Sequence, residues 1–366
     1  MKIFHTGDIH IGMKFNRYNE IKEKLIDARF QCLENMINKS NELECDLFVI
    51  AGDLFNSLKI TKNEIQRTIE IINKFNGNAL LILPGNHDYD NGSNMLWNTL
   101  KKESGDKVII INEKRPYSLK DYNLDVLIYP APCNNKHSAV NALDWIKNHR
   151  LDEDDFEYKI GVAHGAIEGL SADTQGQYYY MTFNELNEIP VDIWLIGHTH
   201  ISYPFEKEIY NNKIFNAGTP EADGLNFSDK ACAWYIELNK YTNRAIKIPT
   251  GKYHFVDTEY TVKSNEDIEK MKNEILEHNP EIKIIRLKIK GNLSHDEYIN
   301  IKHYYSEIED KVLCLIVDDD DLKEKVDVEK ISKEFTKGSF PYEFLMKLSD
   351  DSDTMQIAYD LIRGDE

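Results

Sequence analysis

The sequence predicts a layered α/β domain followed by a smaller α/β domain and a helical C-terminal tail. Over residues 1–240, short apolar runs alternate with stretches of helical character. Continuous apolar runs of this kind are typical of buried strands in sheets that helices cover on both faces. A compact cycle of strand-like and helix-like segments follows, and then an acidic, helix-like stretch. We therefore expect domains over residues 1–245 and 246–318 and a tail over residues 319–366.

The strands expected in the first domain are apolar runs that end in glycine and polar residues. After a first short run that leads into "HTGDIHIG" (5–12), they are "DLFVIAGD" (46–53), "ALLILPGNHD" (79–88), "YKIGVAHG" (158–165) and "VDIWLIGHTH" (191–200). Helical stretches at 19–43 and 62–75 lie between them. This alternation is the pattern of an α/β layered domain.

The second domain should be a strand–helix–strand–helix–strand cycle. Its expected segments are 255–262, 265–279, 282–291, 294–310 and 311–320. The tail reads as helical and too short for a sizeable core of its own. Its apolar anchors are Phe335, Phe340, Phe344, Leu345, Leu348, Ile357, Leu361 and Ile362.

Composition excludes several classes of protein. No apolar run approaches the roughly 20 residues that span a bilayer, and the N-terminus lacks a signal-peptide pattern, so a cytoplasmic location without membrane contact is expected. The five cysteines form no CxxC pair, which argues against a disulfide framework or a zinc knuckle. The formal net charge of −19 argues against a nucleic-acid binder. Bound divalent cations, however, invert the local sign of an acidic site.

Polar motifs recur where the expected strands of the first domain end. They are Asp8-Ile9-His10, Gly52-Asp53, Gly85-Asn86-His87-Asp88, Ala163-His164-Gly165 and Gly197-His198-Thr199-His200. Ligands of layered α/β domains bind beyond the carboxyl ends of the strands, so we expect the motifs to converge. Asp8 and His10 should share one face of an extended segment, because they are two positions apart.

The chemistry of these motifs predicts a centre with two metal ions. The nitrogen and oxygen donors are Asp8, His10, Asp53, Asn86, His164, His198 and His200. Seven donors without a thiolate are too many for one tetrahedral zinc, and they favour manganese or iron. Two such ions can clamp a phosphate and activate a water, and His87 remains as a proton donor. Any one motif alone would be read as surface or core, but five of the 12 histidines fall in these motifs.

The motifs "GDIH", "GDLF", "GNHD", "AHG" and "GHTH" resemble, in order and spacing, those of the calcineurin-like metallophosphoesterases. "HTGDIHIG", "AGDLF" and "LPGNHD" are most similar to the DNA double-strand-break repair nucleases of the meiotic recombination eleven type, in an archaeal-like short form. The resemblance implies a two-sheet sandwich flanked by helices. It also implies a DNA-capping second domain and a tail that docks an SMC-like ABC ATPase of the Rad-fifty type.

The resemblance also assigns roles. Two Mn²⁺ ions per chain are implied, one held by Asp8, His10 and His200, the other by Asn86, His164 and His198. Asp53 would bridge them, and His87 would be catalytic, supported by a carboxylate that the sequence does not identify. The implied activity is 3′-to-5′ exonuclease action on duplexes and endonuclease action on single strands. Asn56 stands where many relatives carry a second histidine, which puts exonuclease efficiency in question.

The implied partners are DNA and a second copy of the chain, in a nucleoid-associated setting. Basic residues that follow the metal motifs are candidates for phosphate contacts, with solvated surface as the alternative for each. They are Lys14, Arg17, Lys59, Lys62 and Arg67. A homodimer would use the segments 63–75 and 94–101. For 63–75, however, Ile65, Ile69, Ile72 and Phe75 also fit a core face.

Other phosphoesterases remain as alternatives. A protein phosphatase of this superfamily carries Gly-Asp-x-x-Asp-Arg-Gly, and the corresponding "GDLFNSLK" lacks that arginine. A phosphodiesterase or phosphatase that acts on a small molecule would leave the second domain and the tail unexplained. A non-catalytic scaffold would be favoured by the loss of a ligand, and none is lost.

Overall fold

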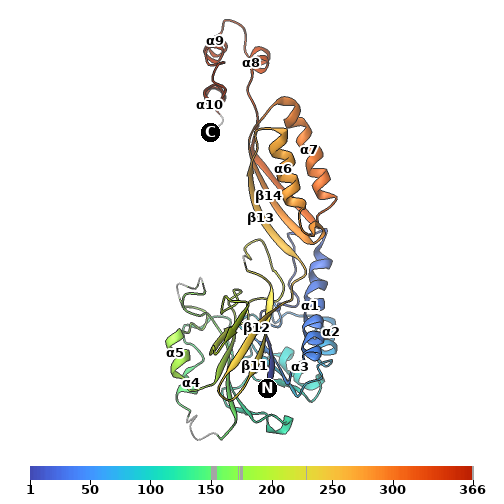
Figure 1. The fold of residues 1–366 in the computed structure, drawn as a ribbon, viewed down its shortest axis with the longest axis vertical. Helices are drawn as coiled ribbons and strands as arrows, with labels where there is room; N and C mark the ends of the chain where they lie inside the picture. Colours follow the sequence, from blue (N-terminus) through green and yellow to red (C-terminus); the bar gives the residue numbers. More distant parts are fainter. Residues whose placement is uncertain (150–154, 172, 174–175, 228, 365–366) are drawn as a thin grey trace. The chain divides into compact units, whose positions relative to one another are not determined.

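The computed structural model describes residues 1–149, 155–171, 173, 176–227 and 229–364, and the chain divides into two units (Figure 1). The first unit is Met1–Tyr253 and the second is His254–Glu366. The predicted boundary after residue 245 therefore lies inside the last strand of the first unit.

The first unit contains two sheets flanked by helices. Its strands are β1 (Lys2–Thr6), β2 (Leu47–Ala51), β3 (Ala79–Leu83), β4 (Val108–Ile110), β5 (Tyr117–Ser118), β6 (Val126–Ala131), β7 (Tyr158–His164), β8 (Ile193–Gly197), β9 (Glu208–Tyr210), β10 (Ile214–Asn216), β11 (Cys232–Leu238) and β12 (Asn243–Pro249). Its helices are α1 (Lys22–Glu42), α2 (Lys62–Ile72), α3 (Met95–Glu103), α4 (Asp144–Lys147) and α5 (Phe183–Glu188), with the short η1 (Lys120–Tyr122).

Strand order brings the predicted motifs to one edge of each sheet. The larger sheet has the order β4-β3-β2-β1-β11-β12-β9 and the smaller has β10-β8-β7-β6-β5. Strands β1 to β4 are mutually parallel, and so are β10, β8, β7 and β6. The carboxyl ends of neighbouring parallel strands meet at one edge, so the loops after β1, β2 and β3 adjoin, as do those after β7 and β8.

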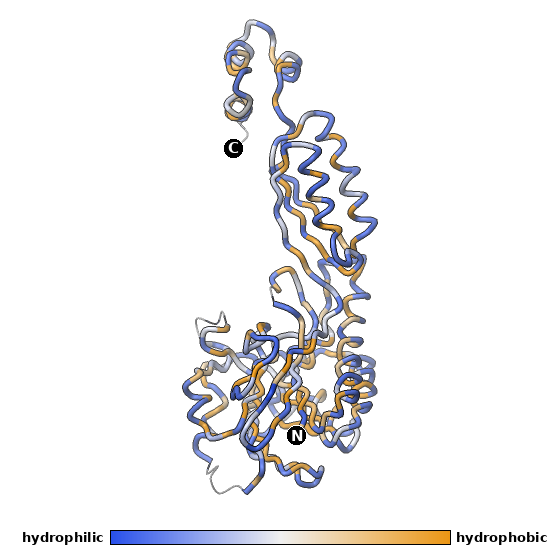
Figure 2. Tube along the Cα trace, in the orientation of Figure 1, coloured by the Kyte–Doolittle hydropathy of each residue, from blue (hydrophilic) through white to orange (hydrophobic). Residues whose placement is uncertain are grey.

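The two sheets pack face to face, which makes each strand apolar on both sides. In β2, Leu47 and Val49 lie in the core between the sheets, whereas Phe48 and Ile50 lie in the core beneath the helices. Figure 2 shows this concentration of apolar residues along the strands. The two-sheet sandwich implied by the resemblance is confirmed. Within the described ranges of the first unit, helices cover one face of each sheet and not both as expected, because the other sheet covers the second face.

The apolar face of α2 belongs to the core. Ile65, Ile69, Ile72 and Phe75 are all buried in the cluster between the helices and the larger sheet. The core interpretation of this face is therefore confirmed, and these residues are not available to a second chain. A capping box formed by Thr61 and Glu64 begins the helix.

The second unit contains the predicted alternation of strands and helices. In chain order its elements are β13 (His254–Thr261), α6 (Asn265–Leu276), η3 (Pro280–Ile282), β14 (Lys283–Leu293), α7 (His295–Glu309) and β15 (Cys314–Glu324). The three strands form a parallel sheet, with β14 in the centre. Because β15 continues to Glu324, the acidic run Asp318–Asp321 lies within a strand, and the predicted start of the tail at residue 319 falls inside it.

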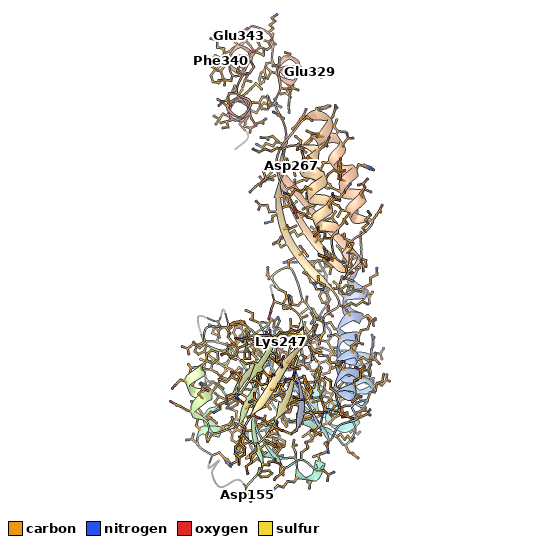
Figure 3. All side chains as sticks on the ribbon, viewed as in Figure 1. Asp155, Lys247, Asp267, Glu329, Phe340 and Glu343 are labelled. Atoms are coloured by element: carbon orange, nitrogen blue, oxygen red, sulfur yellow. The ribbon has the colours of Figure 1, made fainter. Side chains whose placement is uncertain are left out.

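Three helices end the second unit, namely α8 (Val328–Glu334), α9 (Phe340–Met346) and α10 (Ser352–Arg363). They bury a small cluster of their own, made of Val326, Ile331, Leu345, Met355, Ala358 and Tyr359. Other predicted anchors are exposed: Phe340, at the start of α9 (Figure 3), is 76% exposed, and Phe344, Ile357 and Leu361 are also exposed. In the described part of the chain, no helix has both the length and the apolar content that crossing a membrane requires.

Candidate metal centre

The strand ends converge as predicted, although not through extended backbone. Strand β1 ends at Thr6, and both Asp8 and His10 have the left-handed φ of +53°. The prediction that they share a face of an extended segment is therefore wrong, because two turns aim their side chains instead. Backbone hydrogen bonds hold these turns: the Asp8 N–H donates to the Gly52 carbonyl (3.1 Å), and the His10 N–H donates to the Asp53 carbonyl (3.0 Å).

Strained backbone is concentrated at these residues. Asp53 and His198 also have positive φ, of +50° and +99°. Each such residue costs about 1–3 kcal/mol and persists only where surrounding contacts enforce it. Here the carboxylate of Asp8 accepts the N–H of His198 (2.8 Å), and that of Asp53 accepts the N–H of His87 (2.8 Å). The fold therefore holds these side chains in place before any ligand arrives.

Asp8, His10 and His200 form a first group of donors. Their ligand atoms all lie within 4.8 Å of one another. The Nε2 atoms of His10 and His200 are 3.2 Å apart, and His200 Nε2 is 3.9 Å from Oδ1 of Asp8. Two imidazole nitrogens and a carboxylate oxygen that face one point are a suitable half-shell for a divalent cation.

A second group of donors adjoins the first. Asp8, Asp53 and His164 also have ligand atoms within 4.8 Å of one another. Asn86 Oδ1 is 3.0 Å from His164 Nε2 and 2.9 Å from His198 Nδ1. Oδ2 of Asp53 is 3.4 Å from His164 Nε2 and 3.8 Å from His10 Nε2, which places it between the two groups. All seven predicted donors are thus brought together.

An unpaired oxygen shows that these residues fit a cation. In the described part of the chain, the fully buried Oδ1 of Asp8 has no hydrogen-bond partner. Burial of an unpaired carboxylate oxygen is costly, and such atoms are rare in native proteins. A divalent cation would satisfy this oxygen together with the nitrogens that face it. The donor set, which has oxygen and nitrogen but no sulfur, suits manganese or iron.

Burial and the neighbouring carboxylates together decide which side chains of the centre carry a charge. Burial lowers the pKa of His198 to about 3, and burial also lowers the pKa of His10 well below its ordinary value. Burial raises the pKa of Asp8 to about 6. Burial alone would lower the pKa of His164, but the carboxylate of Asp53 outweighs burial and raises it to about 9. Neutral His10 and His198 keep a lone pair for a metal ion.

His87 lies at the edge of the centre and is held by the main chain. Its ring packs edge to face on His10, with centroids 4.9 Å apart, and its Nδ1 is 3.1 Å from the carbonyl of Asn56. The family resemblance implied a supporting carboxylate. Asp88, the next residue, instead accepts the backbone N–H groups of Gly85 (2.7 Å) and Phe55 (3.0 Å). Its role is to fix the loops after β2 and β3.

Two further residues at the centre were missed by sequence reasoning. Asp223 Oδ2 is 2.8 Å from Nδ1 of His200, and the ring of Tyr178 stacks on His198 with centroids 5.2 Å apart. Burial alone would raise the pKa of Asp223, but the hydrogen bond from His200 outweighs burial and lowers it. Neither residue lies in a strand-end motif, so no sequence signal marked them.

The predicted basic residues lie in two different settings. Lys14, Arg17, Lys59 and Lys62 are exposed. They lie on two segments that are joined next to the centre, where the Asn56 N–H donates to the carbonyl of Ile11 (2.8 Å). Arg67 is engaged with α1, because it pairs with Asp27 at 2.5 Å and lies 4.1 Å above the ring of Phe30.

A sandwich whose strand ends deliver nitrogen and oxygen donors to two adjoining positions defines a class of metal-dependent hydrolases. The family model of the calcineurin-like phosphoesterases matches residues 1–202, and the chain belongs to this family. Metallophosphoesterases hydrolyse phosphoesters at a dinuclear metal site. Among solved structures, the chain is similar to the calcineurin-like phosphoesterase YfkN from Bacillus subtilis, with 14% identity and a TM-score of 0.38 over 68% of this chain and 90% of that chain.

Proposed function

We propose that the protein is a manganese-dependent DNA nuclease that processes DNA ends in double-strand-break repair together with an SMC-like ATPase. The observation that carries this proposal is the convergence of all seven motif donors, with His87 beside them. The motif set that resembles the break-repair nucleases is therefore assembled into one centre. The exposed basic segments next to the centre favour a polyanionic substrate over a small one.

The residues around the metal positions fit phosphodiester hydrolysis. Bound divalent ions supply Lewis acidity and an activated water at such a centre. A carbonyl oxygen only accepts hydrogen bonds, so the contact with Asn56 fixes a hydrogen on Nδ1 of His87. Nε2 would give a proton to the leaving oxygen from the imidazolium form, in which it carries the second ring hydrogen, and the ring would return to the neutral form with its hydrogen on Nδ1. The side chain of Asn56 makes no part of this contact, so the replacement of a histidine there leaves the support of His87 intact.

The partners follow from exposed side chains. Lys14, Arg17, Lys59 and Lys62 would contact the DNA backbone by neutralising phosphates. The exposed Phe340, Phe344, Ile357 and Leu361 of the tail would bind the ATPase as an apolar surface on an amphipathic segment. Met95, 76% exposed at the start of α3, would belong to a homodimer interface that brings two active sites to DNA.

The test is digestion of end-labelled duplex DNA by the full chain in manganese. We expect cleavage that a chelator abolishes and that a His87→Ser variant lowers by at least a hundredfold, since general acid–base catalysis contributes 10²–10⁴-fold. The matched control is His303→Ser, because His303 is an exposed histidine on α7. His87→Ser should still bind metal, since His87 is not among the donors.

The proposal is contradicted if the wild-type chain leaves DNA intact in manganese but hydrolyses p-nitrophenyl phosphate or its diester. That outcome would favour the phosphodiesterase or phosphatase that the family membership equally allows.

A further inference from the structure

The loop after β10 contacts two donors of the Asp8–His10–His200 group. Its residue Thr219 donates through Oγ1 to the backbone carbonyl of Asp8 (2.9 Å). Asp223, at the end of the same loop, accepts from Nδ1 of His200 (2.8 Å). Asp8 and His200 both belong to the first group of donors, so the loop holds that group at two points.

A buried arginine fixes this loop to the turn that carries the first group. Arg29 of α1 is 1% exposed, and it donates to the carbonyl of Ile9 (2.7 Å) and to that of Ala222 (3.1 Å). Ile9 separates Asp8 from His10, and Ala222 precedes Asp223. The arginine therefore ties the ligand turn and the Asp223 loop into one unit.

The histidines of the second group are oriented differently. Nδ1 of His164 is 2.8 Å from the backbone carbonyl of Ala51. Nδ1 of His198 is 2.9 Å from the amide oxygen of Asn86, which is itself a donor of the second group. Both partners are neutral. Among the described residues, His200 is the ligand histidine that pairs with a carboxylate outside the donor set, namely that of Asp223.

We propose that Asp223 is a positioning residue that selectively raises the cation affinity of the Asp8–His10–His200 position. The hydrogen bond to Asp223 keeps the proton of His200 on Nδ1 and turns Nε2 toward Asp8 and His10. A carboxylate behind a ligand histidine also makes its metal-binding nitrogen more basic, and loss of such a partner typically weakens metal binding 10–100-fold. The inference rests on the family's dinuclear centre and not on the DNA substrate.

The experiment is a titration of the full chain with Mn²⁺, with free ion measured by electron paramagnetic resonance. We expect two ions per wild-type chain. Asp223→Ala should weaken one of them by 10–100-fold and leave the other unchanged, and Asp223→Asn, which keeps an acceptor without the charge, should fall between. Glu208→Gln is the matched control, because it removes an exposed carboxylate on β9.

A double variant separates positioning from general damage. If Asp223 acts through His200, then Asp223→Ala combined with His200→Ala should bind metal like His200→Ala alone. Unfolding in chelator should occur at the wild-type temperature for Asp223→Asn. Wild-type affinity at both positions in Asp223→Ala, or equal loss at both, would overturn the proposal. DNA cleavage enters neither result, so the outcome is independent of the proposed nuclease activity.

Discussion

At the scale of single residues, the centre can form only because glycines let the backbone of two loops lie very close to donor residues. A Cβ atom on Gly85 would lie 2.1 Å from Oδ1 of Asp53 and 2.3 Å from its backbone nitrogen. A Cβ on Gly52, where φ is +91°, would lie 2.0 Å from Nδ1 of His164. Both glycines therefore let the loops after β2 and β3 pack against donors of the centre, Gly85 against Asp53 and Gly52 against His164.

We predict that Gly85→Ala abolishes binding of both metal ions. The methyl group would displace Asp53, whose Oδ2 lies between the groups, and metal-dependent phosphoester hydrolysis should fall at least a hundredfold. Calorimetric titration with Mn²⁺ measures the loss directly. Gly224→Ala is the control, since a Cβ there meets nothing within 4 Å. Wild-type stoichiometry in Gly85→Ala would show that Asp53 does not need this approach.

The donors could be predicted from the sequence, but their supports could not. Asp8, Asp53 and His164 follow apolar runs, and strand ends of a layered domain meet at one edge, so position along the chain was sufficient. The support of His87 is a backbone carbonyl, which any residue at position 56 would supply. Asp223 lies in the loop after β10, and the short strands β9 and β10 separate it from His200 along the chain, so no periodic pattern marks the pair.

At the scale of elements, apolar runs identified β1, β2, β3, β7 and β8 because the sandwich buries both faces of these strands, whereas the other strands of the first unit were not predicted. The alternation of Phe48 and Val49 between two different cores is invisible in the sequence, where both residues are simply apolar. Element ends were less predictable. The acidic residues Asp318–Asp321 suggested a break, yet β15 continues through them because an edge strand of a sheet tolerates charge.

A buried histidine in β1 makes the stability of the fold depend on pH. His5 lies among backbone carbonyls of Phe215, Ile196 and Val49, and burial lowers its pKa from 6.5 to about 4. The unfolded chain therefore binds a proton between these pH values and the folded chain does not. The contribution of His5 to the free energy of unfolding is fully present above pH 6.5 and is lost as the pH falls toward 4. The loss is about 2 kcal/mol between pH 7 and pH 5.

We predict that His5→Gln removes this component. The variant should be less stable than wild type at pH 7, because a buried ring is lost, but the difference should shrink by about 2 kcal/mol at pH 5. Urea unfolding in chelator at the two pH values measures it. A stability difference that stays constant with pH would show that His5 is protonated in the folded chain or is not the source of the slope.

At the scale of the whole molecule, the net charge of −19 opposes the binding of a polyanion. If the proposed DNA binding occurs, it would depend on a local basic surface, for which the candidates are the exposed Lys14, Arg17, Lys59 and Lys62 beside the centre. If four phosphates are neutralised, the logarithm of the affinity should fall with the logarithm of the salt concentration with a slope of roughly −3.6. Affinity would then drop roughly a hundredfold between 50 and 200 mM salt.

We predict that the double variant Lys59→Gln, Lys62→Gln reduces this slope by about 2, because two phosphate contacts are removed. Filter binding of duplex DNA by chains that also carry His87→Ser measures the slope without cleavage. Lys333→Gln combined with Lys337→Gln changes the net charge equally, in exposed lysines of the tail, and should leave the slope at its wild-type value. Equal effects of the two pairs would mean that total charge, not the surface beside the metal centre, governs DNA binding. Binding that does not depend on salt concentration would contradict a polyanionic substrate.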